Sequence, residues 1–141
     1  MVYLDTSLIV PYFLPESTSS QVEAFLREFS SGLAVSLWTK TEFSSAVGIK
    51  QRSGQISAAQ ADDAVARFRV IVPDYFIVLV PREQDFDLAT EYLSHRELGL
   101  RSGDALHLAI AANHRAECLY SLDKGLVSAA ARLNVPAALG I

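Results

Sequence analysis

The sequence predicts a single three-layer α/β/α domain with a central parallel sheet. Short apolar segments alternate with longer segments in which apolar residues recur at helical spacing. Strands that are apolar throughout are typical of a parallel sheet covered on both faces. The length of 141 residues suits one core, and no repeat or linker divides the chain. We therefore expect one domain over residues 1–141.

In the first half of the chain, the expected elements have clear start and stop signals. Pro15 ends a short helix, because proline lacks the N–H of a helical hydrogen bond, and Gly32 ends an amphipathic one. Ser57 is a typical N-cap residue. In order, we expect a strand at 2–4, helices at 7–14 and 17–31, a strand at 33–37, a helix at 39–52 and one from the Ser57 cap to about residue 70.

The second half continues the alternation. Pro73 and Pro81 bound a β-branched and aromatic strand, Gly99 ends the next helix, and Ser102 is placed to cap an apolar one. We expect a strand at 75–80, helices at 82–98 and 102–114, a strand at 118–120, a helix at 123–133 and a short last strand at Val135. Right-handed crossovers should connect the parallel strands.

The composition favours a globular protein and argues against several functions. Half of the residues are hydrophobic and 20% are charged. The formal net charge of −4 argues against binding nucleic acid by a broad basic surface, but is compatible with phosphate contacts through metal ions and a few basic side chains. Cys118 is the single cysteine, so no internal disulfide forms. We expect no membrane span, no signal peptide and a cytoplasmic protein.

Three acidic residues lie where apolar strands meet helices. Asp5 follows the strand at 2–4, Asp123 follows the strand at 118–120, and Asp104 opens an apolar helix. Ligands of open parallel sheets bind outside the carboxyl ends of the strands. Each acid has an alternative interpretation as a helix cap or as a first-turn acid favoured by the helix dipole. Together they predict an acidic pocket that requires a cation to keep its carboxylates ionised.

Glu42 is a fourth acid, on the helix at 39–52. It shares a row with Trp38 and Ile49, so it is expected to point toward covered surface. The alternative is an acid at the edge of the apolar stripe, paired with Lys40 or Lys50.

The four acids predict a metal site for phosphodiester chemistry. Carboxylate oxygens, without a cluster of cysteine and histidine at zinc spacing, select Mg²⁺ or Mn²⁺. Such ions activate water and neutralise phosphate charge in phosphodiester hydrolysis. The expected catalytic and metal-binding residues are Asp5, Glu42, Asp104 and Asp123, with Asp5 and Asp104 binding most directly.

Other polar residues near these acids are candidates for supporting roles. His107 follows Asp104 by three residues and is expected to be a structural hydrogen-bonding residue or a partner of Asp104. Ser121 is expected to steady the loop before Asp123 or to contact a bound water. Three basic residues flank the acids and are candidate phosphate contacts, with solvated charges or an ion pair to Asp104 as alternatives: Lys40, Arg101 and Lys124.

On these motifs the chain resembles the PIN-domain nucleases, and most closely the VapC-type toxins of bacterial and archaeal toxin–antitoxin pairs. Four segments match in order and spacing: residues 2–7, residues 41–42, residues 100–109 and residues 121–123, with Ser121 where threonine is common. The resemblance covers essentially the whole chain. It implies a PIN-like fold, the same acidic quartet with Ser7 as a polar helper, endoribonuclease activity, a VapB-like antitoxin that blocks the site, and homodimerisation.

The first short helix carries much apolar surface, at Leu8, Ile9, Tyr12 and Phe13. One stripe can face the sheet, and the rest is expected to serve a groove. In VapC-like proteins such a groove receives an antitoxin helix or tail, often with a basic side chain in the acidic pocket. The alternative is that these four residues are ordinary core or dimer contacts.

Three other functions are weighed against a nuclease. A catalytically silent PIN-like module that binds RNA or protein is disfavoured by the intact acidic quartet. A receiver-type signalling domain requires paired acids after the first strand and an aspartate after the third, whereas Asp5 stands alone and Val80 leads into Pro81. A dinucleotide-binding domain would show a G-x-G-x-x-G motif after a strand, which this chain lacks.

Overall fold

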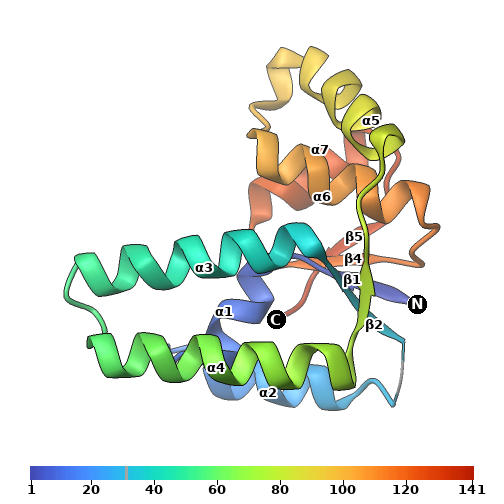
Figure 1. Ribbon diagram of the computed structural model, residues 1–141. Helices are drawn as coiled ribbons and strands as arrows, with labels where there is room; N and C mark the ends of the chain where they lie inside the picture. Colours follow the sequence, from blue (N-terminus) through green and yellow to red (C-terminus); the bar gives the residue numbers. More distant parts are fainter. Residues whose placement is uncertain (31) are drawn as a thin grey trace.

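In the part of the chain that the structure describes, the sheet has five parallel strands in the order β3-β2-β1-β4-β5, with helices on both faces (Figure 1). The computed structural model describes residues 1–30 and 32–141. The strands are β1 (Val2–Leu4), β2 (Leu33–Ser36), β3 (Ile77–Leu79), β4 (Leu119–Ser121) and β5 (Ala137–Leu139). The helices are α1 (Thr6–Phe13), α2 (Ser19–Arg27), α3 (Leu37–Arg52), α4 (Ala58–Tyr75), α5 (Glu83–Ser94), the 3₁₀ turn η1 (Arg96–Leu98), α6 (Ser102–Asn113) and α7 (Lys124–Arg132). The predicted parallel α/β/α class is confirmed.

The strand order reverses at β1. From β1 the chain crosses to β2 and β3 on one side, and it then returns to β4 and β5 on the other. The register pairs Val2 with Leu33 of β2 and Leu4 with Tyr120 of β4. The carboxyl ends of β1 and β4 therefore flank a topological switch point, the place where ligands of open α/β sheets bind.

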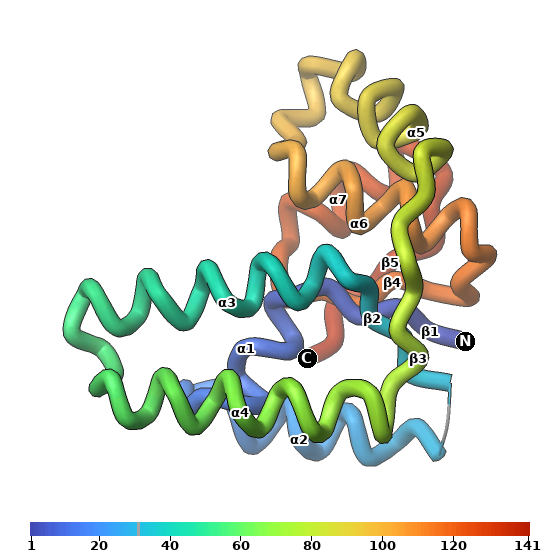
Figure 2. Tube along the Cα trace, viewed as in Figure 1, coloured from blue at the N-terminus to red at the C-terminus, as the bar shows by residue number. Residues whose placement is uncertain are grey.

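Neighbouring residues of β1 belong to two different cores, one on each face of the sheet. Leu4 belongs to the core formed with α1 to α4, where Phe43 and Phe68 stack with ring centroids 4.4 Å apart. Tyr3 belongs to the core formed with α5, α6 and α7. Figure 2 shows α3 and α4 as an antiparallel pair that extends away from the sheet. The result is a three-layer sandwich with one long helical arm.

The structure places the end of α4 and the start of β3 differently from the prediction. Helix α4 continues through Pro73 to Tyr75, which shortens β3 to Ile77–Leu79. Pro73 lies in the last turn, and the buried Val72 and Phe76 hold this turn against the core of α1 to α4. Tertiary packing therefore outweighs the helix-ending tendency of the proline.

Other boundaries differ by a turn or less. The helix predicted at 82–98 is divided into α5 and η1, and the last strand lies at Ala137–Leu139 rather than at Val135, which is buried in the second core. The N-cap of α6 is Arg101 rather than Ser102. Helix α2 ends at Arg27, and residue 31, the predicted end of that helix, lies outside the described residues. Within the described part of the chain, no helix combines the length and apolar character needed to cross a membrane.

Candidate active site at the carboxyl end of the sheet

Asp5 lies directly after β1 at the switch point and is 5% exposed. Its Oδ1 accepts a hydrogen bond from the backbone N–H of Ser7 at 2.6 Å, which makes Asp5 the N-cap of α1. Its Oδ2 accepts a hydrogen bond from the Ser121 hydroxyl at 2.7 Å. The capping interpretation of Asp5 is therefore correct, and the same carboxylate also lines the cleft described below.

Two serines join the loops that follow β1 and β4. The Ser7 hydroxyl accepts a hydrogen bond from the Leu122 N–H at 2.8 Å, and it also contacts the Asp5 carboxylate. The Ser121 hydroxyl, fully buried, accepts from the Asp123 N–H at 2.9 Å. These bonds fix the position of Asp123 relative to Asp5, because each serine contacts both loops.

Asp123 is the N-cap of α7. Its Oδ1 accepts hydrogen bonds from the N–H groups of Gly125 at 2.7 Å and Leu126 at 3.2 Å. Its Oδ2 is 3.5 Å from Nη2 of Arg101. One oxygen thus satisfies the helix end while the other is available to the cleft.

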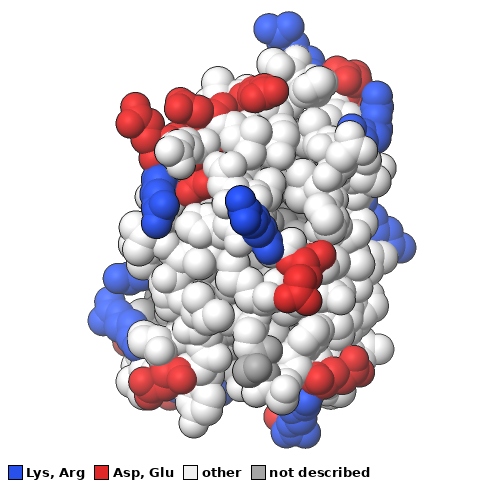
Figure 3. Space-filling view, turned by 90° about the vertical axis from the view of Figure 1, so that its right-hand side faces the viewer, with Lys and Arg blue, Asp and Glu red and all other residues white. Residues whose placement is uncertain are grey.

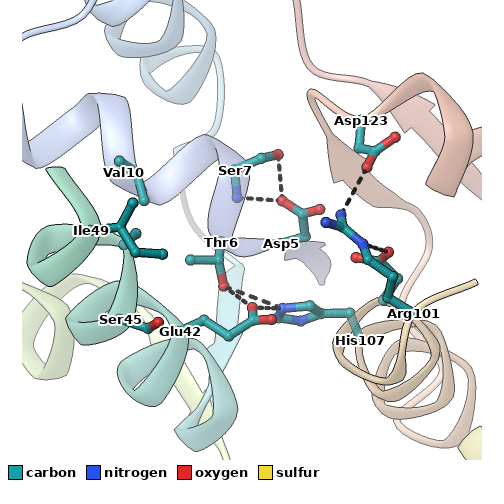
Figure 4. A pocket seen from close by; sticks show the side chains of 12 residues that line it. Asp5, Thr6, Ser7, Val10, Glu42, Ser45, Ile49, Arg101, His107 and Asp123 are labelled. Carbon is teal, nitrogen blue, oxygen red and sulfur yellow. Dashed lines mark hydrogen bonds and ion pairs between the residues drawn. The ribbon is translucent and has the colours of Figure 1, made fainter. Parts of the chain in front are cut away.

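Asp104 lies in the first turn of α6 and is bound to the same arginine. Nε of Arg101 donates to Asp104 Oδ2 at 3.1 Å, so the Arg101 guanidinium bridges Asp104 and Asp123 (Figure 4). The pKa of Arg101 is raised by its hydrogen bond to Asp104, and further by the charges of both carboxylates.

Glu42 is held by two donors rather than by a lysine. Its Oε2 accepts from the Thr6 hydroxyl and from Nε2 of His107, each at 2.5 Å. Lys50, one of the predicted alternatives, pairs with Glu16 instead. Burial acts to raise the pKa of the Glu42 carboxyl, but the hydrogen bond and charge of His107, aided by Thr6, bring it below the ordinary value of 4.5.

His107 is buried and connects the acids to the core. Its Nδ1 pairs with the Tyr3 hydroxyl at 2.7 Å, and that hydroxyl donates to Ser36 at 2.9 Å. The prediction of a structural hydrogen-bonding histidine agrees with these contacts. Its carboxylate partner is Glu42 rather than Asp104, a contact between residues 65 apart in sequence.

Gly103 and Thr6 were not identified from the sequence. A Cβ atom added to Gly103 would lie 2.5 Å from Oε1 of Glu42 and 3.5 Å from the indole of Trp38, so only glycine leaves the Glu42 carboxylate its present position. Thr6 donates to the same carboxylate. A glycine beside Asp104 within a helical segment was the available signal for a close approach.

All four acids line one cleft of about 440 Å³. The acids lie at one end, with Asp5 in the middle and Glu42 and Arg101 on facing elements (Figure 4). The other end is formed by α1 and α3 and is apolar, with Val10, Ala46 and Ile49. The structure therefore brings together the quartet that the sequence predicted from four separate segments.

The donor chemistry of the cleft fits a divalent cation, but part of the site is engaged by internal groups. Arg101 is a cationic stand-in between Asp104 and Asp123, which identifies the position between these carboxylates as one suited to positive charge. In the side-chain arrangement of residues 1–30 and 32–141, no three acidic, histidine or cysteine groups are placed to hold one ion together. In this arrangement Arg101 engages Asp104 and Asp123, and His107 engages Glu42. Metal ligation by Asp5, Asp104, Glu42 and Asp123 would require Arg101 to move.

The structure separates the three candidate phosphate contacts. Arg101 lines the acidic cleft, whereas Lys40 lines a different hollow with Phe68 and Val78. Lys40 precedes Glu42 by two residues, which turns it about 200° around the helix and away from the acids. Lys124 is exposed at the start of α7 and is not among the residues that line the cleft.

The predicted groove on the first helix requires correction. Leu8 and Ile9 are fully buried and Phe13 is 3% exposed, all three within the core of α1 to α4. Tyr12 is half-buried and lines a hollow with Phe29 and Phe76 that does not include the acids. The alternative that these are core residues agrees with the structure, because α2, α3, α4 and β4 pack against the short helix.

The sequence profile of the PIN domain matches residues 2–132. The chain belongs to the PIN-domain family. Three solved structures illustrate the shared PIN fold. FitAcB from Neisseria gonorrhoeae is 18% identical with a TM-score of 0.78, covering 99% of this chain and 98% of that one. VapC20 from Mycobacterium tuberculosis, a toxin that cleaves the sarcin–ricin loop, is 17% identical with a TM-score of 0.73, covering 92% and 95%.

The third structure is VapBC2 from Rickettsia felis bound to a fragment of its promoter DNA. It is 16% identical with a TM-score of 0.66 and covers 99% of this chain and 98% of that one. At these identities the similarity establishes the PIN fold. A comparison with curated protein sequences finds no match.

Proposed function

We propose that this PIN domain is a Mg²⁺- or Mn²⁺-dependent endoribonuclease that acts as the toxin of a toxin–antitoxin pair in the cytoplasm. The observation that carries the proposal is the convergence of Asp5, Glu42, Asp104 and Asp123 on one cleft at the switch point of the sheet. Similarity to VapC20, a toxin that cleaves the sarcin–ricin loop, and to the FitAcB and VapBC2 structures supports this assignment.

Each part of the site has a role in such a reaction. A bound divalent ion would activate water for in-line attack and neutralise charge on the scissile phosphate. Asp5 and Asp104 are placed to hold the ion, and Glu42 and Asp123 to ligate it or to orient its waters. Ser7 and Ser121 fix the separation of Asp5 and Asp123, and His107 and Thr6 hold the Glu42 carboxylate. This second set of contacts keeps the acids ordered before substrate binds.

Cleavage assays test the proposal directly. The purified chain, freed of any partner, is incubated with single-stranded and stem–loop RNAs in Mg²⁺, Mn²⁺ or EDTA. Asp104→Asn and Asp5→Asn should each lower the cleavage rate by about hundredfold or more, because each removes a carboxylate that holds the metal ion, which in turn would stabilise charge on the reacting phosphate. The exposed Asp62 of α4 provides the matched control, Asp62→Asn, which should cleave as the parent does. Undiminished cleavage in excess EDTA contradicts a metal-dependent enzyme, and RNA binding without cleavage under all conditions supports the silent module.

The apolar end of the cleft suits an antitoxin tail. Val10, Ala46 and Ile49 lie beside the acids, so an amphipathic peptide could cover the apolar end and place a basic side chain among the carboxylates. Such a side chain would compete with metal for the same oxygens, which gives inhibition an electrostatic cause. This surface replaces the groove that the sequence suggested on the buried side of α1.

A homodimer is proposed on the face that carries β3. Tyr75, Ile77 and Val80 are 76%, 46% and 59% exposed around this edge strand. Figure 3, which views the side that lies on the right in Figure 1, shows broad uncharged areas, with one basic and one acidic group near the middle and other charged groups toward the rim. Exposed apolar side chains around an edge strand are suited to a second copy of the chain.

A further inference from the structure

Arg101 is a cation placed inside a site that the proposed function assigns to a metal. Its Nε and Nη2 contact Asp104 at 3.1 Å and Asp123 at 3.5 Å, and these acids come from helices α6 and α7. Among the described residues that line the cleft, it is the sole lysine or arginine. The forked guanidinium therefore holds together two carboxylates that otherwise repel each other.

Little packing holds Arg101 in this position. Its side chain is 78% exposed, and as N-cap of α6 it makes no side-chain hydrogen bond to the helix end. Exposed ion pairs are weak, because water and salt screen them. The arginine also lines a neighbouring hollow of about 380 Å³, together with Trp38, Thr41 and Ser102. Open space therefore lies directly beside the side chain.

We propose that Arg101 is an internal counter-cation that competes with the divalent metal for Asp104 and Asp123. In the metal-free protein it screens the two carboxylates and stabilises the loop before α7 against α6. When metal binds, the guanidinium moves to the neighbouring hollow, and the work of displacing it lowers the apparent metal affinity. The inference rests on the proposed metal site, and it assigns to Arg101 a role that sets how much metal is needed to fill that site.

A permanent structural ion pair predicts the opposite behaviour. If Arg101 only holds the acids in the shape that metal requires, then its removal disorders the ligands and weakens metal binding. If it competes with metal, then its removal tightens metal binding while it destabilises the metal-free protein. The direction of the change in metal affinity therefore separates the two roles.

The experiment measures Mn²⁺ binding by electron paramagnetic resonance of free Mn²⁺, and thermal unfolding with and without Mn²⁺. Arg101→Gln removes the charge and keeps much of the side-chain length. Arg27→Gln is the matched control, because Arg27 is also exposed, pairs with a carboxylate (Glu23) on α2 and changes the net charge equally. Arg101→Lys keeps the charge but has one ammonium group in place of the forked guanidinium, so its Mn²⁺ affinity should lie between those of the parent and Arg101→Gln.

We expect Arg101→Gln to bind Mn²⁺ about two- to tenfold more tightly than Arg27→Gln, the range given by losing one or two exposed ion pairs. Its metal-free melting temperature should fall at low salt, and the rise on adding Mn²⁺ should exceed that of the control. Equal or weaker Mn²⁺ binding by Arg101→Gln overturns the inference. Asp104→Asn identifies the other failure: if the parent and Asp104→Asn bind Mn²⁺ alike, the proposed metal site itself is wrong.

Discussion

Replacement of Gly103 by alanine tests whether the position of Glu42 depends on a missing side chain. The new Cβ would lie 2.5 Å from Glu42 Oε1, whereas ordinary contact begins near 3.4 Å, so the carboxylate must move by about 1 Å. That movement disturbs its 2.5 Å bonds from Thr6 and His107. Weakening a hydrogen bond to a charged group costs about 1.5–3 kcal/mol. In the opposite direction, alanine stabilises a helix by about 0.5–1 kcal/mol relative to glycine.

We therefore expect Gly103→Ala to lower the free energy of unfolding by about 1–2 kcal/mol, a fall of roughly 3–6 °C in melting temperature. A double-mutant cycle with Glu42→Ala gives the matched control. In the Glu42→Ala background the carboxylate that would clash with the new Cβ is absent. The same alanine at position 103 should then stabilise the protein by up to about 1 kcal/mol. Urea unfolding of the four proteins measures both effects. If alanine at position 103 changes stability equally in the two backgrounds, then Gly103 does not position Glu42.

Three further predictions concern stability and assembly. Ser121→Ala should lower the free energy of unfolding by about 1–3 kcal/mol, because the buried hydroxyl forms hydrogen bonds with both Asp5 and the Asp123 N–H. Ser121→Thr keeps those bonds, so equal melting temperatures of the two variants would contradict this. Since the pKa of Glu42 is below its ordinary 4.5, ionised Glu42 stabilises the protein above that pH, and this stability is lost as the pH falls through the lowered pKa. Urea unfolding between pH 3 and 7 should show a steeper fall in the free energy of unfolding at acid pH in the parent than in Glu42→Gln. Parallel curves would count against the His107 pairing. Tyr75→Asp should shift the chain from dimer toward monomer in light scattering, whereas the control Phe86→Asp, on the exposed surface of α5, should not. An unchanged mass for Tyr75→Asp would place the dimer interface elsewhere.

The fold was predictable because its signals are local. Strands that are apolar throughout, such as residues 2–4, and helix ends marked by Gly99 or a Ser57 cap require no knowledge of distant contacts. The errors arise where tertiary packing decides. Pro73 stays within α4 because Val72 and Phe76 are anchored in the core, and a sequence window cannot reveal that anchorage. The short helix α1 is surrounded on several sides, so its apolar residues belong to the core rather than to a groove.

The site was predictable as a set of acids but not as a set of contacts. The chain order places Asp5 and Asp123 after parallel strands, and parallel strands bring their carboxyl ends to one edge. Which oxygen meets which donor depends on side-chain rotamers of residues far apart in sequence. Glu42 meets His107 across 65 positions and Arg101 meets Asp123 across 22, and neither pair has a spacing that local rules recognise.

Helix capping is compatible with the proposed metal binding at two of the four acids. Asp123 gives Oδ1 to two N–H groups of α7 and directs Oδ2 at Arg101, so the cap fixes the carboxylate plane and aims the second oxygen. Asp5 is held in the same way by the Ser7 N–H on one oxygen and by Ser121 on the other. A carboxylate that is ordered by backbone donors loses little conformational entropy when a cation arrives. Capping therefore orders Asp5 and Asp123 in advance, and it explains why two positions with an ordinary structural interpretation are also candidates for chemistry.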